Sequence, residues 1–372
     1  MSAKHLYIGR IANIPINLDY SWFLIFVLLT WSLAVSYFPE RFPGWAGWEY
    51  WLIGAISTIL LFVSVLLHEL GHATAARRFR IPVREITLFI FGGVAKIQEE
   101  PRDAWSEFWI AVAGPLVSLL LGILFLLLMF VNNKPAQLGA LFDYLGTINI
   151  SLFLFNLIPG FPLDGGRVFR AIVWGATNDA RKATLTAVAV GRFFAYAFIV
   201  SGVGLMFAGQ VFNGLWMAFI GWFLENAAVA QQQQQKLRTV LSRYQVQQAM
   251  TPTYTLLPAH LSLETLMQKH ILGTGKRAYI VHENGHPIGM LTIHQLKQIP
   301  TSEWPRHTIK DVMMPLEQAH TIGPDDDLWK ALSAMDSEGV NQLPVIERNE
   351  VIGMISRENL VSFLQRLSTV SI

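Results

Sequence analysis

Two histidines and a glutamate stand close together in an apolar stretch, in the segment His68-Glu69-Leu70-Gly71-His72. On an α-helix, residues four apart lie on one face about one turn apart, so both imidazoles can reach the same ion. Glu69 would lie beside the first ring, where a carboxylate can take a proton from a metal-activated water. The segment therefore predicts a metal-dependent hydrolytic centre.

The surroundings of this segment strengthen the prediction. Residues 50–76 form one of the long apolar runs of the chain, and an ionisable side chain at membrane depth is costly unless it has a partner or lines a cavity. Apart from His5, no other histidine precedes residue 255. The competing interpretation is that both rings are ordinary hydrogen-bonded core residues. We expect a metal site.

A catalytic zinc ion usually has three protein ligands and leaves one position for water. The chain contains no cysteine, so the third ligand must be a carboxylate or another histidine. The acidic candidates in the membrane half are Glu69, Asp164, Glu225, Glu85, Asp103, Glu107, Asp143 and Asp179. We favour Asp164, because Pro and Gly residues break the apolar run just before it and free backbone groups that can line a polar site. The alternative is a surface aspartate in a plain turn.

Asn156 lies in the same broken run as Asp164. A buried amide is costly unless it has hydrogen-bond partners. Asn156 could hold the backbone of a substrate, or it could equally form a hydrogen bond between two helices.

The elements that must position these residues are membrane-spanning helices. Hydrophobic residues make up 52% of the 372-residue chain and charged residues only 15%, which places much of it in lipid. A spanning helix needs about 20 mostly apolar residues. The candidate spans are 19–37, 50–76, 107–131, 141–158, 184–208 and 211–227. We therefore expect a polytopic α-helical membrane domain of about six spans over residues 1–228.

Basic residues collect in alternate loops, as they do on the cytoplasmic side of membrane proteins. With the N-terminus inside, six spans leave only Arg41 and Lys134 outside. The N-terminal segment lacks the pattern of a cleavable signal peptide. We expect a multi-pass protein with both termini in the cytoplasm, in a prokaryotic cytoplasmic membrane or a thylakoid.

The segment 81–100 favours strands over a helix, because it combines Pro82, the Gly92-Gly93 pair and several β-branched residues. Strand backbone at membrane depth is tolerated only against protein or a water-filled cavity. The segment could therefore bind an extended peptide as an added strand, near Gly92 and Gly93. The alternative is a surface hairpin.

From residue 247 the chain carries an internal repeat with a period of about 64 residues. Residues 249–252 (AMTP) recur as residues 313–315 (MMP), and residues 279–292 recur as residues 343–356. Each copy predicts an extended segment, a helix, two short strands and a final helix. We expect a polar linker at 229–246, a first repeat at 247–300 and a second at 308–368.

The pairing of residues 68–72 with Asn156-x-x-Pro159-x-x-x-x-Asp164-Gly165 resembles the site-2 protease family of intramembrane zinc metalloproteases. Residues 91–95 (FGGVA) and 113–115 (AGP) are also similar to that family. The C-terminal repeats resemble a tandem pair of CBS domains. Together these features resemble the subgroup of the family that carries a C-terminal CBS pair.

The resemblance implies one zinc ion held by His68, His72 and Asp164, with Glu69 as general base and Asn156 near the substrate. It implies a helical membrane domain with a membrane-associated β segment, followed by a cytoplasmic α/β tandem CBS domain. The substrate would be a membrane protein cleaved within a transmembrane segment close to the cytoplasmic face.

In CBS domains, a Gly followed by Ser or Thr and then by Asp three residues later often contacts the ribose and phosphate of an adenine nucleotide. Thr292 and Ser356 match the hydroxyl positions, but Gln295 and Asn359 stand where Asp is usual. The resemblance implies nucleotide binding through Thr292, Ser356 and Asn359. The alternative is a purely structural role in a homodimer formed through the CBS domains.

Two other functions fit parts of the sequence, namely a CBS-regulated membrane transporter and a non-catalytic zinc-binding membrane protein. A transporter predicts an internal repeat of broken helices and gives no role to a glutamate beside two histidines. The formal net charge of +2 is too small to indicate a nucleic-acid partner. A zinc-dependent intramembrane endopeptidase is the function that the membrane half favours.

Overall fold

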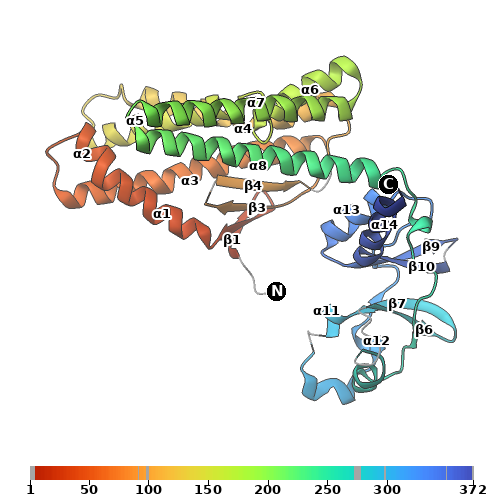
Figure 1. The fold of residues 1–372 in the computed structure, drawn as a ribbon. Helices are drawn as coiled ribbons and strands as arrows, with labels where there is room; N and C mark the ends of the chain where they lie inside the picture. Colours follow the sequence, from red (N-terminus) through yellow and green to blue (C-terminus); the bar gives the residue numbers. More distant parts are fainter. Residues whose placement is uncertain are drawn as a thin grey trace. The chain divides into compact units, whose positions relative to one another are not determined.

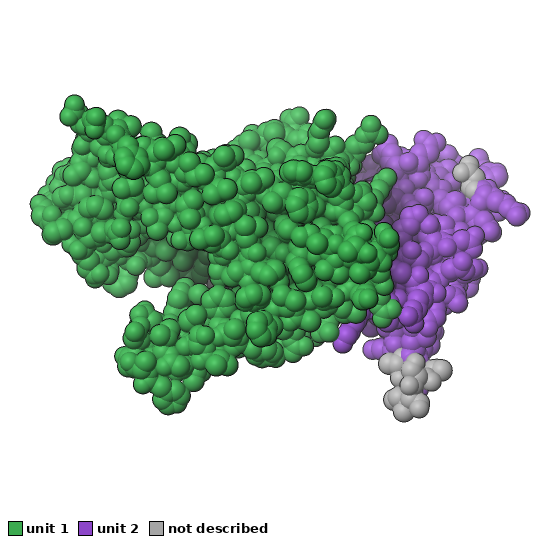
Figure 2. All heavy atoms as spheres, turned by 90° about the horizontal axis from the view of Figure 1, so that it is seen from above, with its two compact units in different colours: residues 1–235 green, residues 236–372 purple. Residues whose placement is uncertain are grey.

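A computed structural model describes residues 5–90, 92–97, 100–271, 278–296, 299–348 and 350–370 of the chain. The chain divides into two compact units, residues 1–235 and 236–372, which are green and purple in Figure 2. Figure 1 shows that long helices dominate the first unit, whereas shorter helices and strands build the second. Phe91, Gln98 and Glu99 of the segment expected to form strands lie outside the described residues.

Five of the described helical segments are long and apolar enough to cross a membrane. They agree with the first five predicted spans to within five residues at either end. They are Ser21–Arg41 (α1, Ser21–Ser32, continued by a π-helical turn, Leu33–Tyr37, and α2, Phe38–Arg41), α3 (Gly47–Arg78), α4 (Ala104–Leu128), α5 (Ala136–Asn156) and α7 (Ala180–Phe207). A short amphipathic helix that the sequence did not predict, α6 (Asp164–Thr177), precedes α7.

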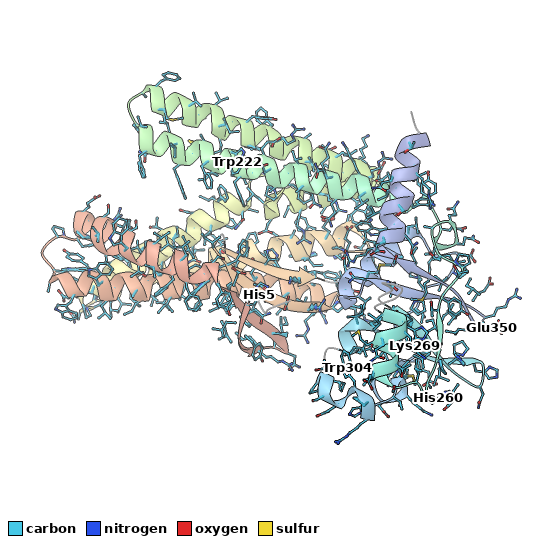
Figure 3. The ribbon with its side chains drawn as sticks, turned by 60° about the horizontal axis from the view of Figure 1, so that its bottom comes forward. His5, Trp222, His260, Lys269, Trp304 and Glu350 are labelled. Carbon is cyan, nitrogen blue, oxygen red and sulfur yellow. The ribbon has the colours of Figure 1, made fainter. Side chains whose placement is uncertain are left out.

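The sixth predicted span forms the first part of α8 (Val211–Leu241), which is not among the five apolar helices. This part nevertheless packs closely along α7. A Cβ atom added to Gly202 would lie 2.5 Å from the carbonyl oxygen of Gly214, and one added to Gly221 would lie 2.6 Å from that of Ala195. Such approach through small residues is typical of helix pairs in membranes. In Figure 3, Trp222 marks α8, and its side chain is 56% exposed.

A four-stranded sheet lies against α3 in the first unit (Figure 1). Its order is β1 (His5–Ile11), β2 (Ile14–Asp19), β3 (Val83–Phe89) and β4 (Gly92–Ile97). The hairpin of β3 and β4 confirms the strands predicted within 81–100, while β1 and β2 were not predicted. β3 pairs in parallel with β2 and antiparallel with β4. Ile14, Ile16 and Ile86 form a small core with Leu70 and Ala73 of α3.

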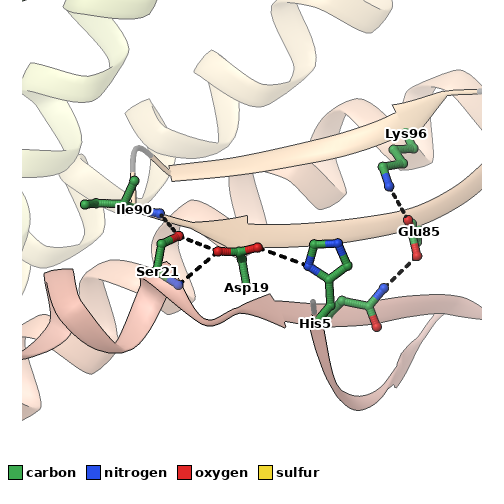
Figure 4. A network of polar contacts seen from close by, with 7 residues as sticks. His5, Asp19, Ser21, Glu85, Ile90 and Lys96 are labelled. Carbon is green, nitrogen blue, oxygen red and sulfur yellow. Dashed lines mark hydrogen bonds and ion pairs between the residues drawn. The ribbon is translucent and has the colours of Figure 1, made fainter. Parts of the chain in front are cut away.

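Polar contacts attach both ends of the β3–β4 hairpin to the N-terminal strands (Figure 4). At the turn, the Ile90 N–H donates to Ser21 Oγ, which in turn donates to Asp19. At the open end, the Asn17 amide of β2 donates to Glu85 Oε2 at 2.6 Å, and Lys96 Nζ lies 2.6 Å from Glu85 Oε1. Partial burial alone would raise the pKa of Glu85, but the hydrogen bond and charge of Lys96 lower that pKa below its usual value.

The second unit has two sheets, of order β5-β6-β7-β8 and β10-β9. Its elements follow the predicted order of extended segment, helix, strand pair and helix in each copy. They are β5 (Leu256–Pro258), α9 (Leu263–Leu266), β6 (Ala278–Glu283), β7 (His286–Thr292), α11 (Ile293–Leu296), α12 (Ile309–Val312), β8 (Met314–Pro315), α13 (Leu328–Glu338), β9 (Gln342–Glu347), β10 (Glu350–Ser356) and α14 (Arg357–Val370).

The two copies of the repeat are closed by segments exchanged between them. Met314 pairs with Met290 in the first copy, and Thr251 pairs with Met354 in the second. A glycine in each strand pair leaves space for the exchanged segment. A Cβ atom on Gly353, for example, would lie 2.8 Å from the carbonyl oxygen of Thr251. The two copies are therefore joined by backbone pairing in both directions.

Candidate metal centre

Three ligand atoms converge between α3 and the start of α6. His68 Nε2 lies 3.0 Å from Asp164 Oδ2, His72 Nε2 lies 3.2 Å from the same oxygen, and the two nitrogens are 3.2 Å apart. The histidines are 7% and 4% exposed. Within the described part of the chain, this is the one group of at least three His, Asp or Glu residues whose ligand atoms come within 4.8 Å of each other.

The outward nitrogens of both rings are held by α4. His72 Nδ1 lies 2.6 Å from the carbonyl oxygen of Ile110, which can only accept, so the ring proton is on Nδ1. His68 Nδ1 lies 2.9 Å from Ser118 Oγ, which can also accept. With the proton of His68 on Nδ1 and donated to Ser118, the two Nε2 atoms would face each other with lone pairs, an arrangement that a cation between them would stabilise. These outer hydrogen bonds are typical of metal-ligating histidines, and the residues present fit a zinc ion.

Two glycines bring α4 close enough to make these bonds. A Cβ atom on Gly114 would lie 2.2 Å from His72 Nε2 and 2.6 Å from His68 Nε2, so any side chain there would fill the site. A Cβ atom on Gly71 would lie 2.9 Å from the carbonyl oxygen of Ala113. Gly71, between the histidines, therefore sets the distance between α3 and α4.

Glycines also place Asp164, the first residue of α6. A Cβ atom on Gly165 would lie 2.4 Å from the carbonyl oxygen of Leu157, and one on Gly166 would lie 2.3 Å from the carbonyl carbon of Gly160. The start of α6 thus packs directly on the backbone of the turn after α5. A side chain at position 165 or 166 would push α6, and the carboxylate that it carries, away from the histidines.

A buried ion pair ties α6 to α4 further along. Arg170 donates to Glu107 Oε1 at 2.6 Å, and the Glu107 side chain is 0% exposed. Because α4 holds both histidine rings and α6 carries Asp164, this pair fixes the two elements that complete the ligand set. Burial makes such a pair sensitive to the loss of either partner.

The other acidic candidates for the third ligand lie outside the cluster and have partners of their own. They form ion pairs or cap helices, as Glu225 with Arg192, Glu85 with Lys96, Glu107 with Arg170, Asp143 with Arg41, Asp103 at the N-cap of α4 and Asp179 at that of α7. Asp164 alone among these candidates meets the histidines in the described residues.

Glu69 does not join the three ligand atoms. Its Oε2 accepts the N–H of Ala95 in β4 at 3.1 Å, so the carboxylate lies between α3 and the sheet. Gly92 and Gly93 open β4, and Gly93 lies directly over the Glu69 side chain. Asn156 is the last residue of α5 and is partly buried.

The remaining predicted site residues lie in the second unit, at the starts of helices. Asn359 Oδ1 accepts from the N–H and Oγ of Ser356, and its amide donates to Thr251 Oγ1. Gln295 Oε1 similarly accepts from the N–H and Oγ1 of Thr292. These pairs cap α14 and α11, a local role that needs no ligand.

Sequence reasoning missed Ile110 and Ser118 as partners of the histidines. A signal was present, because Ile110, Gly114 and Ser118 follow one another at four-residue intervals and therefore share one face of a helix. On that face, a small residue lies between two residues that can each contact a ring. The role of this pattern could be recognised only once the position of α3 was known.

Comparison with known proteins agrees with this geometry. The model of peptidase family M50 matches residues 56–136 and 132–201, and that of the CBS domain matches residues 309–366. A Synechocystis protein named as a zinc metalloprotease is 33% identical over 369 residues, which cover 97% of this chain and 96% of its own. Rip3 of Mycobacterium tuberculosis, also named as a zinc metalloprotease, is 33% identical over 363 residues, which cover 96% of this chain and 92% of Rip3.

A solved structure from the same group is also similar. The site-2 protease from Methanocaldococcus jannaschii is 29% identical, with a TM-score of 0.42, over 61% of this chain and 94% of its own. The relatives of nearly full length decide the assignment, since the whole chain aligns with proteins named as zinc metalloproteases. The chain is a multi-pass membrane protein that belongs to peptidase family M50, the site-2 family of zinc metalloproteases, and carries a CBS domain at its C-terminal end.

Proposed function

We propose that this chain is an intramembrane endopeptidase that binds one zinc ion through His68, His72 and Asp164 and cleaves transmembrane segments of other membrane proteins. The observation that carries the proposal is the convergence of these three ligand atoms between helices of a family M50 chain. When bound, zinc lowers the pKa of a coordinated water and polarises the scissile carbonyl.

Glu69 is the proposed general base. It directly follows His68 on α3, and its carboxylate accepts the Ala95 N–H outside the ligand set, so it can exchange a proton without breaking that set. It takes the proton from water and gives it to the leaving amine. Ile110 and Ser118 keep both histidine rings in one orientation during these steps.

The proposed substrate is a membrane-spanning segment in extended form. A helical segment has its backbone groups paired internally, so it must unwind before its peptide bonds can be attacked. Among the described residues, β4 is an edge strand of its sheet. We propose that the unwound segment adds to β4 near Gly92 and Gly93 and that Asn156 holds its backbone, close to the cytoplasmic face.

Replacement of Glu69 by glutamine tests the enzyme proposal. Glu69→Gln should keep one zinc ion per chain, because the ligand atoms are untouched, and lose cleavage by about 10²-fold to 10⁴-fold, the usual contribution of a general base. The measurement is cleavage of a panel of single-span proteins in a host without such a protease, with zinc content of the purified chains. Glu40→Gln, at an exposed position, is the matched control.

The same variant separates the proposal from its alternatives. A transporter would have no reason to lose transport when Glu69 loses only its charge, and a non-catalytic zinc protein would show no cleavage even as the wild type. Cleavage by Glu69→Gln at the wild-type rate would therefore contradict the proposed role of Glu69. Asp164→Asn should instead lose zinc, since it changes a proposed ligand.

We propose that both termini lie in the cytoplasm, in a prokaryotic cytoplasmic or thylakoid membrane. Close packing of α8 along α7 supports a sixth crossing, because two helices in such contact share the same depth. The proposed domain limits are 1–228 for the protease, 229–246 for the linker, and 247–300 and 308–368 for the two CBS repeats. The linker falls largely in α8, which continues as a helix to Leu241.

We propose that adenine nucleotides regulate the enzyme through Thr292, Ser356 and Asn359, and that the CBS repeats form a homodimer. The Ser356 hydroxyl lies at the N-terminus of the 14-residue helix α14, which favours phosphate, whereas Thr292 precedes only the four-residue α11. Their present partners are Gln295 and Asn359, so a nucleotide would have to compete with these caps.

Titration of the full-length chain with ATP, ADP and AMP tests the nucleotide proposal by calorimetry. Binding should weaken in Ser356→Ala, because its hydroxyl is a proposed contact, and stay unchanged in the control Ser302→Ala, at an exposed position. Absence of binding heat with all three nucleotides would contradict the nucleotide proposal. The purely structural role of the CBS repeats would then remain.

A further inference from the structure

We infer that strand β4 positions the general base, through the Ala95 N–H and through the absence of a side chain at Gly93. The inference rests on the proposed function, in which Glu69 moves the proton. It assigns Gly93 and Ala95 a role in the proton transfer, beyond the docking of a substrate strand. Both residues are positioning residues, since they act through Glu69.

The first observation is the hydrogen bond between the strand and the carboxylate. The Ala95 N–H donates to Glu69 Oε2 at 3.1 Å. A bond to a charged acceptor is stronger than one between neutral groups, and it fixes a side chain that otherwise has several rotamers. No other hydrogen bond of the Glu69 carboxylate is recorded among the described residues.

The direction of this N–H is set by the sheet. Ala95 stands opposite Ile86 in the antiparallel ladder, and its N–H goes to Glu69 instead of to β3. Backbone groups of successive strand residues turn to opposite edges. Gly93 and Ala95 therefore share the edge that faces away from β3, which is the edge proposed to receive the substrate.

The second observation is the space above Gly93. A Cβ atom there would lie 2.5 Å from Glu69 Cγ and 3.2 Å from Glu69 Oε1. Real Cβ atoms do not come this close, so any side chain at position 93 would displace Glu69. The neighbouring Val94 is 45% exposed and turns to the opposite face, so its side chain has no such effect.

The third observation is that β4 is itself fixed in place. The bonds shown in Figure 4 hold the turn through Ile90 and Ser21, and the open end through Glu85, which accepts from Asn17 of β2 and pairs with Lys96 of β4. A strand held at both ends can act as a template for Glu69. General-base catalysis depends on such placement, because small displacements of a catalytic group reduce the rate strongly.

It follows that one edge serves two purposes. A segment that adds to β4 beside Gly93 comes within reach of a carboxylate already aimed along that edge. Binding of the substrate and placement of the base are thus coupled through the backbone of a single strand.

Kinetics of Gly93→Ala and Val94→Ala test the inference. Gly93→Ala should lower kcat at least about tenfold, as expected when a bond to a charged group is lost, while zinc content stays at the wild-type value; any change in KM reports on the substrate strand that the same edge is proposed to bind. Val94→Ala, in the same strand, removes two methyl groups on the face turned away from Glu69 and should leave kcat unchanged. A single-span membrane protein in detergent is the substrate, at several concentrations to separate kcat from KM.

A backbone substitution tests the hydrogen bond without adding atoms. Lactic acid in place of Ala95, introduced by suppression of a stop codon, replaces the N–H by an ester oxygen and should lower kcat in the same way. The matched control is the ester at position 94, where the residue pairs with Thr87 of β3 and not with Glu69. Zinc content reports whether each chain is folded.

Wild-type kcat in the Ala95 ester would overturn the inference and leave the proposed function standing. A rise in KM with constant kcat, in either variant, would also overturn it, because the strand would then only bind substrate. Wild-type protein that binds zinc and cleaves no membrane-spanning substrate would overturn the proposed function and the inference together.

Discussion

Each histidine of the metal centre is held at both ring nitrogens, one toward the site and one toward α4. The hydroxyl of Ser118 and the carbonyl of Ile110 leave each Nε2 free to bind a metal. Gly114 contributes to the centre because it has no side chain that would fill the space beside the two Nε2 atoms. At the scale of single residues, the centre therefore depends as much on α4 as on the segment 68–72.

Loss of the Ser118 hydroxyl should weaken zinc binding. In Ser118→Ala, the buried Nδ1–H of His68 has no acceptor, and such losses beside a metal typically lower its affinity about 10-fold to 100-fold. Competition with a chelator measures the change. Ser57→Ala is the control, since Ser57 is equally buried in α3 and its Oγ has no partner among the described residues. Equal zinc affinity in the two variants would contradict the role of Ser118.

Among the elements, α6 has the most demanding position. It brings the third ligand to α3 and yet, at 14 residues, is too short to span the membrane. Gly165 and Gly166 fit its start onto the preceding turn, and Arg170 joins its middle to Glu107 of α4. The ligand set is complete only while these contacts hold.

Breaking the buried pair should destabilise the protein more than breaking an exposed one. Glu107→Gln leaves Arg170 only the more distant and half-exposed Glu100, at 3.7 Å, as a counter-charge and should cost about 3 kcal/mol. Glu225→Gln breaks a similar pair between α8 and α7, with Arg192, which is partly exposed, and should cost under about 1 kcal/mol. Thermal unfolding in detergent with zinc present compares them. Similar shifts of the unfolding temperature in both variants would mean that burial does not increase the contribution of the Glu107–Arg170 pair to stability.

At the scale of the whole molecule, the side on which the CBS unit lies depends on whether α8 crosses the membrane. Five helices meet the length and apolarity of a span, and α8 falls short because Glu225, Asn226 and a run of glutamines follow its apolar part. Its first part nevertheless packs along α7 through Gly202, Gly214 and Gly221, and the proposed sixth crossing rests on this packing.

Labelling of single cysteines can decide the topology, since the chain has none of its own. Cysteine at Gln210, between α7 and α8, should react with an impermeant maleimide from outside the cell, and cysteine at Ser302 should react only after permeabilisation. Cysteine at Asn133 is the control for an outside loop that does not depend on α8. Reaction of both positions 210 and 302 from outside would show that α8 does not cross.

The first five spans followed from the sequence because each is a local run of apolar residues, and lipid imposes its length. The hairpin within 81–100 and the repeat after residue 247 were also local patterns. The strands β1 and β2 were not predicted, because their stability comes from pairing with β3, far along the chain. α6 was hidden for a similar reason, since packing of glycines on a distant turn holds it.

For the metal centre, the sequence by itself determined His68, Glu69 and His72, because a spacing of four residues places two side chains on one helix face whatever surrounds them. It indicated Asp164 among several carboxylates. Only the tertiary structure brought Asp164 within 3.2 Å of both rings, supplied Ile110 and Ser118, and set Glu69 under β4. The reason is physical: these contacts join α3 to α4, α6 and the sheet, and the close approach of packed helices cannot be derived from any one segment.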